Sequence, residues 1–225
     1  NSILSIIRGS TQIIEANPDN PDKIRTRLSR IKSMVEQGST LVKAMLGFSR
    51  ADDAALLLPD VNAVVTETVP LLGDRLPPEV TVTVDVKEGL PVVHGSRELL
   101  QQILINLVLN ALDAMEGRGQ LTLRCQRLHR LPGNQILPAA RAEEYVAVIV
   151  EDTGCGISPE NLSRIFEPFF TTKAFSTRHG TGLGLSMVYE FCKELGYGLN
   201  VRSELRRGTA FTIIIPVLND QPPAG

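Results

Sequence analysis

One stretch carries the strongest signal for the fold of this chain: Glu98-Leu-Leu-Gln-Gln-Ile-Leu-Ile-Asn-Leu-Val-Leu-Asn-Ala-Leu-Asp-Ala-Met115. Its apolar residues recur every three to four positions, which predicts one long helix that is buried along one side. Its polar side chains fall on a single ridge, at Gln102, Asn106, Asn110 and Asp113. Asparagine is a poor helix former, so two aligned asparagines on such a helix indicate a compensating role.

A metal site would supply that role. A carboxamide oxygen is a hard, neutral ligand that suits Mg²⁺ when phosphates hold the same ion. For this helix alone, an equally open interpretation is that Asn106 and Asn110 form hydrogen bonds with a nearby loop.

A carboxylate and two glycines follow the apolar run 146–150, in Asp152-Thr-Gly154-Cys-Gly156-Ile157. An acceptor-only aspartate suits the exocyclic amine of adenine, and glycines let the backbone approach the ring closely. The pattern also resembles a calcium loop. Position twelve of that loop would need an acid, and Ser163 stands there, which excludes the calcium interpretation.

A glycine-rich turn, Gly180-Thr-Gly182-Leu-Gly184-Leu185, leads into another predicted helix. Backbone N–H groups at such a helix start form a phosphate cradle. The spacing is neither that of a dinucleotide fingerprint nor that of a P-loop. Before it, Phe166-Glu-Pro-Phe169-Phe-Thr-Thr-Lys173 and the polar residues to His179 suggest a mobile lid anchored by its aromatic end.

These four motifs, in this order, resemble the N, G1, F and G2 boxes of the histidine-kinase catalytic domain, within the wider family of gyrase, Hsp90 and MutL. The likeness runs from about Pro91 to Pro216, and the phenylalanine motif is similar to the nitrogen-regulatory and hybrid-kinase subgroup. It implies an α/β two-layer sandwich of the GHKL (Bergerat) type.

The resemblance also implies the ligands, ATP and Mg²⁺. Asn110 would ligate Mg²⁺ with support from Asn106, Asp152 would read adenine, and Lys173 would reach phosphate oxygens. Glycines would shape the adenine pocket and border the triphosphate. The complete implied set is Asn106, Asn110, Asp113, Asp152, Gly154, Gly156, Ile157, Phe169, Lys173, Gly180, Thr181, Gly182, Leu183, Gly184 and Leu185.

The first 50 residues have a different pattern. Apolar positions predict helices over 3–16 and from 24 to about 50, separated by Asn17-Pro-Asp-Asn-Pro21. An antiparallel hairpin with a continuous apolar stripe cannot bury both sides alone, so we expect a homodimeric four-helix bundle. The alternative is that the hairpin packs on the rest of its own chain.

The predicted organisation is a truncated dimerisation and phosphoacceptor hairpin over 1–50, a linker over 51–59, a catalytic domain over 60–218 and a disordered tail over 219–225. Within the catalytic domain, the sequence predicts helices over 61–72, 98–115 and 183–195. It also predicts strands over 80–86, 120–126, 145–151, 199–203 and 209–216, and an exposed loop over 128–142.

The phosphoacceptor histidine is missing from the predicted first helix. The residues Asn1–Gly9 are similar to the continuation of the family's acceptor motif, so we expect the acceptor just upstream of residue 1 and no catalytic residue within the chain. His94, His129 and His179 are expected to be structural or solvated. In the ATPases of the wider family a glutamate stands at the place of Asn106, and a carboxamide cannot accept a proton.

The expected function is therefore that of a sensor histidine kinase core, which passes the γ-phosphoryl of ATP to its own histidine and then to a response-regulator aspartate. The alternative is a degenerate ATP-binding scaffold that transfers nothing. The 23 basic and 25 acidic residues give no reason to expect nucleic-acid binding. No apolar run is long enough to span a membrane, so we expect a cytoplasmic fragment without direct membrane contact. If a membrane sensor belongs to this protein, we expect it upstream of this fragment.

Overall fold

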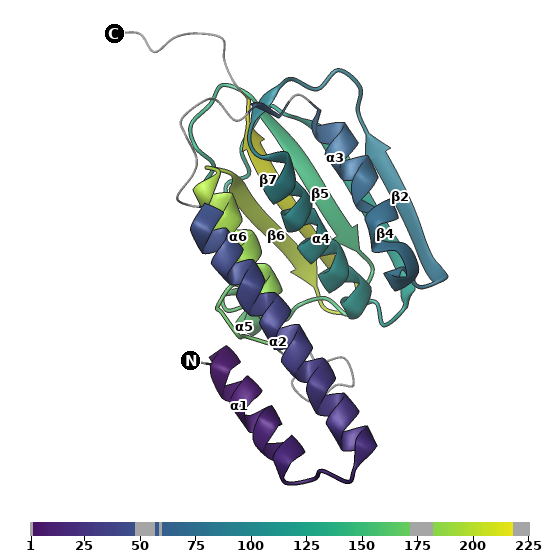
Figure 1. Ribbon diagram of the computed structural model, residues 1–225. Coiled ribbons are helices and arrows are strands. Elements are labelled where there is room, and N and C mark those ends of the chain that lie inside the picture. Colours follow the sequence, from purple (N-terminus) through teal and green to yellow (C-terminus); the bar gives the residue numbers. More distant parts are fainter. Residues whose placement is uncertain (1, 48–56, 59, 172–181, 218–225) are drawn as a thin grey trace. The chain divides into compact units, whose positions relative to one another are not determined.

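The computed structural model describes residues 2–47, 57, 58, 60–171 and 182–217. The chain divides into two compact units, Asn1–Ala54 and Ala55–Gly225 (Figure 1). Within the described ranges, no helix is both long and apolar enough to cross a membrane.

The first unit is a helical hairpin of α1 (Ser2–Glu15) and α2 (Pro21–Gly47). The Nδ2 atom of Asn17 donates to the carbonyl of Ile13 at 2.9 Å and closes the end of α1. Asn20 caps α2, because its Oδ1 atom accepts from the backbone N–H of Lys23 at 3.0 Å, and proline at the first helical position suits this start. Helices α1 and α2 contact each other within this unit.

The second unit is built on a five-stranded sheet in the order β2-β4-β5-β7-β6. The strands are β2 (Glu79–Val86), β4 (Arg118–Leu128), β5 (Tyr145–Asp152), β6 (Gly198–Glu204) and β7 (Gly208–Pro216). Only β2 and β4 are parallel, and the other neighbours are antiparallel. Register pairs Asp152 at the end of β5 with Thr209 near the start of β7. The second unit thus has a mixed, mostly antiparallel sheet.

Three helices cover one face of this sheet: α3 (Val61–Thr68), α4 (Arg97–Ala114) and α6 (Gly184–Glu194) (Figure 1). Helix α4 lies against β4, β5 and β7 and also contacts both α3 and α6. Seven of its apolar side chains are buried: Leu100, Ile103, Leu104, Leu107, Val108, Ala111 and Leu112. Helices on one face of a sheet give the predicted two-layer α/β sandwich.

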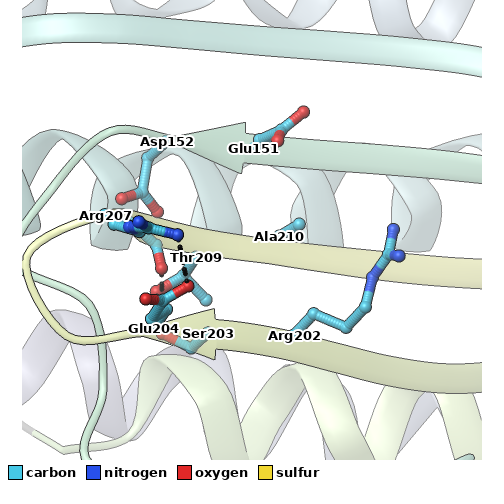
Figure 2. Close-up of a pocket in the computed structure, with 9 residues that line it drawn as sticks. Glu151, Asp152, Arg202, Ser203, Glu204, Arg207, Thr209 and Ala210 are labelled. Atoms are coloured by element: carbon cyan, nitrogen blue, oxygen red, sulfur yellow. Dashed lines mark hydrogen bonds and ion pairs between the residues drawn. The ribbon is translucent and has the colours of Figure 1, made fainter.

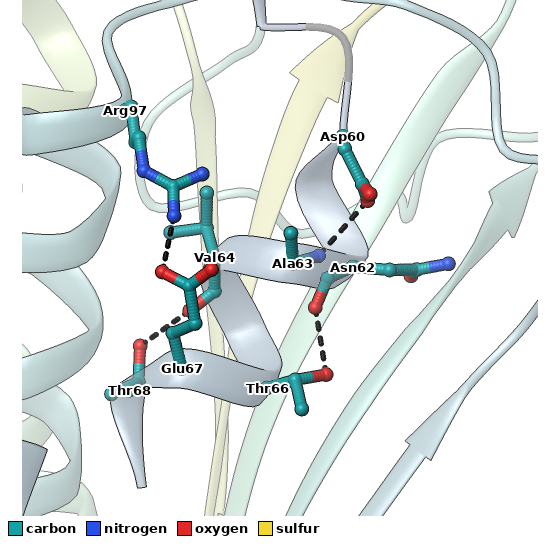
Figure 3. Close-up of polar contacts among 8 residues, drawn as sticks. All are labelled: Asp60, Asn62, Ala63, Val64, Thr66, Glu67, Thr68 and Arg97. Atoms are coloured by element: carbon teal, nitrogen blue, oxygen red, sulfur yellow. Dashed lines mark hydrogen bonds and ion pairs between the residues drawn. The ribbon is translucent and has the colours of Figure 1, made fainter. Parts of the chain in front are cut away.

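Side-chain oxygens accept hydrogen bonds at the starts of α3 and α4, and Figure 3 shows the one at α3. Asp60 accepts from the backbone N–H of Ala63 at 2.9 Å, and Ser96 accepts from that of Leu99 at 3.2 Å. An ion pair between Glu67 and Arg97 joins the two helices. The Ser96-Arg97 dipeptide therefore begins α4 with an ordinary serine cap.

Two expectations need correction. The helix predicted over 61–72 ends at Thr68, because Pro70 cannot continue an α-helix, and a 3₁₀-helix over Pro70–Arg75 follows. The loop predicted over 128–142 is exposed but not free of the sheet. Leu137 forms an antiparallel bridge with Leu199, and the N–H of Ala140 donates to the carbonyl of Gly196 at 2.8 Å.

The sequence also missed short elements. Strands β1 (Leu57–Leu58) and β3 (Val93–His94) pair in a separate two-stranded sheet, so β1 lies in the stretch expected to be a linker. Helix α5 (Pro159–Leu162) is a single turn after the loop over 152–157, which we call the Asp152 loop. Elements of two to four residues are too short for a periodic pattern to reveal.

Candidate functional site

The two asparagines of α4 lie opposite the first residue of α6. A Cβ atom on Gly184 would lie 3.4 Å from Nδ2 of Asn110 and 3.8 Å from Oδ1 of Asn106. Both Nδ2 atoms are buried and have no hydrogen-bond partner among the described residues. A buried donor without a partner costs about 1–3 kcal/mol. These two amides therefore fit a ligand that accepts hydrogen bonds.

Helix α6 begins beside these amides without a side-chain cap from any described residue. Leu183 precedes it and is buried, and its carbonyl accepts from the Ser186 hydroxyl at 2.9 Å and the Met187 N–H at 3.0 Å. The first N–H groups of a helix have no partner within the helix, and the helix dipole favours negative charge there. Gly184 and Leu185 thus stand where an anion would be bound.

Asp152 lies at the end of β5 and is 5% exposed. Its Oδ1 atom accepts from the N–H of Gly154 at 2.8 Å, which turns the chain back toward α4. A Cβ on Gly154 would lie 2.7 Å from the backbone of Ala114, and the N–H of Cys155 donates to the Ala114 carbonyl at 3.0 Å. Glycine is therefore required at position 154 by contact with the end of α4.

Gly156 is required for a different reason. Its φ is +69°, and a Cβ there would lie 2.1 Å from the carbonyl oxygen of Glu204, the last residue of β6. Two hydrogen bonds join this end of the β6–β7 hairpin to the loop. The N–H of Arg206 donates to the carbonyl of Cys155, and the N–H of Ile157 donates to Oγ of Ser203, each at 2.8 Å.

Phe169 and Gly182 join the two ends of the predicted lid. The N–H of Phe169 donates to the carbonyl of Gly182 at 2.8 Å, and both residues have φ near +68°. A Cβ on Gly182 would lie 2.4 Å from the backbone of Phe169. The Phe169 side chain is 45% exposed, so it does not anchor the segment by burial.

Phe166 provides the aromatic anchor instead. Its ring lies 5.8 Å from that of Tyr189 on α6 and 6.5 Å from that of Phe211 on β7, measured between centroids. The Arg164 guanidinium stacks over the Phe170 ring at 4.6 Å. An aromatic side chain thus packs at the start of this segment, and it is Phe166 and not Phe169.

Three of the expected site residues, Lys173, Gly180 and Thr181, lie outside the described residues, as does His179. Asp113 is described and lies one turn beyond Asn110 on the same ridge, half-buried. The structure therefore brings two groups together: the α4 asparagines with the start of α6, and Asp152 with Gly154 and Gly156.

A hollow of about 390 Å³ lies at the end of β5, β6 and β7 (Figure 2). Its lining residues are Glu151, Asp152, Arg202, Ser203, Glu204, Arg207, Gly208, Thr209 and Ala210. Asp152 alone belongs to both this hollow and the sequence motifs. We place the candidate ligand site by the motif geometry, because the unpartnered amides and the start of α6 lie outside this hollow.

Sequence reasoning missed the contribution of the β6–β7 turn. Ser203, Gly208 and Thr209 contact the Asp152 loop, and a Cβ on Gly208 would lie 1.9 Å from the Asp152 carbonyl oxygen. The signal available was Gly208, which stands immediately before the strand predicted over 209–216. A glycine that opens a strand can mark close backbone approach.

The three thiols are free, and two of them are buried in the sheet and helix layers. Burial raises the pKa of Cys125 and of Cys192 to about 12, with the Asp60 carboxylate adding to the effect at Cys125. Both therefore remain protonated at neutral pH and act as small apolar residues. Cys155, in the Asp152 loop, is exposed.

Residues 95–219 match the family described as histidine kinase-, DNA gyrase B- and HSP90-like ATPases. This range is more than half of the chain and contains every motif described above. The chain therefore belongs to this ATPase family.

Within the family, the chain is similar to sensor histidine kinases. It is 34% identical to the sensor kinase CckA of Brucella abortus over 100% of this chain and 24% of CckA. It is 30% identical to the sensory histidine kinase/phosphatase NtrB of Azospirillum brasilense over 99% of this chain and 54% of NtrB. The chain thus spans about a quarter to a half of these relatives. The resemblance drawn from the four motifs is confirmed.

Solved structures agree on the fold. Full-length ShkA in complex with AMPPNP aligns with a TM-score of 0.61 and 26% identity, covering 91% of this chain and 41% of ShkA. The histidine kinase AdeS of Acinetobacter baumannii aligns with a TM-score of 0.65 and 23% identity over 96% of each chain, which supports the fold alone.

Proposed function

We propose that this chain is the nucleotide-binding core of a sensor histidine kinase, which binds ATP with Mg²⁺ and passes the γ-phosphoryl to a histidine of the full protein. A response-regulator aspartate would then receive it. The observation that carries the proposal is the pair of buried, unpartnered amides of Asn106 and Asn110 opposite the start of α6. Donor amides and free N–H groups are suited to phosphate oxygens.

The remaining site residues take roles that fit this arrangement. Asp152 accepts from the adenine amine, while Gly154 and Gly156 keep its loop close to α4 and the β6–β7 turn. The Oδ1 atom of Asn110 would hold Mg²⁺, which neutralises phosphate charge when bound. ShkA, which is 26% identical to this chain, was solved with AMPPNP, an ATP analogue.

Replacing Asn110 with alanine should weaken Mg²⁺-dependent ATP binding about tenfold, because it removes a metal ligand and an amide donor. The measurement is calorimetric ATP affinity with Mg²⁺ and again with EDTA. The loss of the metal ligand should reduce the increment that Mg²⁺ adds, whereas the loss of the amide donor should weaken binding in EDTA as well.

Asn62→Ala is the matched control for Asn110→Ala. Asn62 also has a buried amide atom without a described partner, but it lies on α3 and donates to the carbonyl of Lys87 at 2.7 Å. The Asn62→Ala variant should keep the full gain in ATP affinity that Mg²⁺ provides. An unchanged increment in Asn110→Ala would refute the metal assignment.

Transfer to a histidine, rather than hydrolysis, is the proposed outcome of binding. Asn106 stands one helical turn before Asn110, and a carboxamide cannot act as the general base that activates water. The alternative function, a scaffold that binds ATP without transfer, is favoured by one observation: residues 1–50 contain no histidine.

Incubation with γ-labelled ATP separates the two functions. The present chain should hydrolyse ATP very slowly and take up no label. A longer form that carries a histidine N-terminal to residue 1 should acquire an acid-labile, base-stable phosphoryl group, as expected for phosphate on nitrogen. If that form binds ATP and dimerises but takes up no label, the scaffold function is correct. Brisk hydrolysis by the present chain would contradict the role of Asn106.

We also propose that residues 1–50 form a homodimer through a four-helix bundle. Leu28 and Val35 lie seven residues apart on α2 and are 53% and 52% exposed in the single chain. Residues at this spacing share one helix face, so a partner helix would bury both.

Light scattering at tens of micromolar should give twice the 24.5 kDa mass of one chain. The double variant Leu28→Glu/Val35→Glu should be monomeric, because it places charge in the bundle. Arg30→Gln, at an exposed position on the same helix, should leave the dimer intact. A monomeric unsubstituted chain would rule the bundle out.

A further inference from the structure

The Ser203 hydroxyl connects three segments around the proposed adenine site. It accepts from the N–H of Ile157 at 2.8 Å, donates to the carbonyl of Gly208 at 3.0 Å and lies 2.9 Å from Oγ1 of Thr209. Figure 2 shows Ser203 and Thr209 on neighbouring strands, with Asp152 beyond Thr209 on β5. One side chain outside the four motifs thus contacts the loop, the turn and the next strand.

These contacts determine which hydroxyl donates to which. A carbonyl can only accept, so the contact with Gly208 uses the single proton of Ser203. The short contact between the two hydroxyls must then use the proton of Thr209. Thr209 is left with acceptor lone pairs for any other group that meets its oxygen.

Thr209 stands next to Asp152. The two residues are register partners in the antiparallel pair β5–β7, and each is 5% exposed. Directly opposed side chains in such a pair lie on the same face with Cβ atoms about 5 Å apart. A carboxylate and an acceptor hydroxyl are therefore adjacent at this end of the sheet.

We propose that Ser203 is a positioning residue that holds the Thr209 hydroxyl as an acceptor beside Asp152 and thereby strengthens the preference for a 6-aminopurine nucleotide over a 6-oxopurine one. The inference rests on the proposed ATP-binding function. An exocyclic amine donates to both acceptors, whereas a 6-oxo group would place a third acceptor beside them.

The test compares ATP with inosine triphosphate, which differs only in the purine functional groups at positions 1 and 6. Affinities are measured by calorimetry for the full chain. In Ser203→Ala the Thr209 proton is released to rotate, so the ratio of ATP to inosine triphosphate affinity should fall about two- to tenfold. Ser203→Thr keeps a hydroxyl and should restore the ratio.

A second variant protects the test from a folding failure of Ser203→Ala. Thr209→Val keeps the branched shape that suits a strand and leaves the Ser203 bonds to Ile157 and Gly208 in place. It should lower the ratio by a similar factor, and adding Ser203→Ala to it should lower the ratio little further. Thr212→Ala, on the same strand and the opposite face, should leave the ratio unchanged.

The outcomes are distinguishable. If Ser203→Ala weakens both nucleotides equally or changes neither, the positioning role is wrong while ATP binding stands. If the unsubstituted chain does not bind ATP, the proposed function fails and this inference fails with it.

Discussion

Replacing Asp152 with asparagine is expected to weaken ATP binding about ten- to a hundredfold. Loss of a charged acceptor costs roughly 1.5–3 kcal/mol. The substitution keeps an Oδ1 atom that can accept from the Gly154 N–H, so the loop retains its internal bond. The second carboxylate oxygen becomes an NH₂ donor, which opposes the donor amine of adenine.

Calorimetric titration with ATP and Mg²⁺ measures this effect. Glu151→Gln is the matched control, because it neutralises the adjacent carboxylate, which faces solvent and pairs with Arg124 at 2.9 Å. A surface ion pair of this kind contributes about 1 kcal/mol or less to stability, and the ATP affinity should not change. Equal affinities for Asp152→Asn and the unsubstituted chain would show that adenine is read elsewhere.

Replacing Gly156 with alanine is expected to lower the free energy of unfolding of the second unit by about 2–5 kcal/mol. The left-handed backbone at φ +69° costs a non-glycine residue about 1–2 kcal/mol. The contact adds about 1–3 kcal/mol of overpacking, because the new Cβ would meet the Glu204 backbone at 2.1 Å. The neighbouring atom is backbone, so it cannot rotate away.

Gly89→Ala separates the two contributions. Gly89 has φ +68° and no atom within 4 Å of an added Cβ. Only the cost of the left-handed backbone, about 1–2 kcal/mol, should therefore remain in Gly89→Ala. Urea unfolding followed by tyrosine fluorescence reports on the second unit, because all three tyrosines lie in it and the chain has no tryptophan. Equal destabilisation by the two substitutions would show that the β6–β7 turn moves aside freely.

The Asp152 loop is therefore held in place by contacts on two sides. Gly154 contacts the end of α4, while Gly156 contacts the β6–β7 turn, which also bonds the loop through Arg206 and Ser203. Preorganised contacts of this kind lower the entropy that a ligand must remove on binding. We therefore expect the two glycines and the Ser203 hydroxyl to preorganise this loop for a ligand.

Regular elements with a strong period could be predicted closely. The helix expected over 98–115 is observed over Arg97–Ala114, and the strand expected over 145–151 is observed over Tyr145–Asp152. The helix expected over 61–72 was wrong beyond Thr68, where Pro70 outweighed the apolar spacing of Leu71 and Leu72. The pairing of Leu137 with Leu199 had no signal, because a bridge depends on a partner 62 residues away (199 − 137).

Three features could be read from the amino-acid sequence alone: the periodic helix with its asparagine ridge, the Asp152 motif with its two glycines, and the family fold that these motifs indicate. Periodicity and backbone conformation are local properties, so the chain carries them in neighbouring residues. Three contacts could be seen only in the folded chain: Gly184 faces Asn106 and Asn110, Gly156 meets Glu204, and Ser203 accepts a hydrogen bond from Ile157. These contacts join residues tens of positions apart, and the packing of helices on the sheet alone sets which atoms meet.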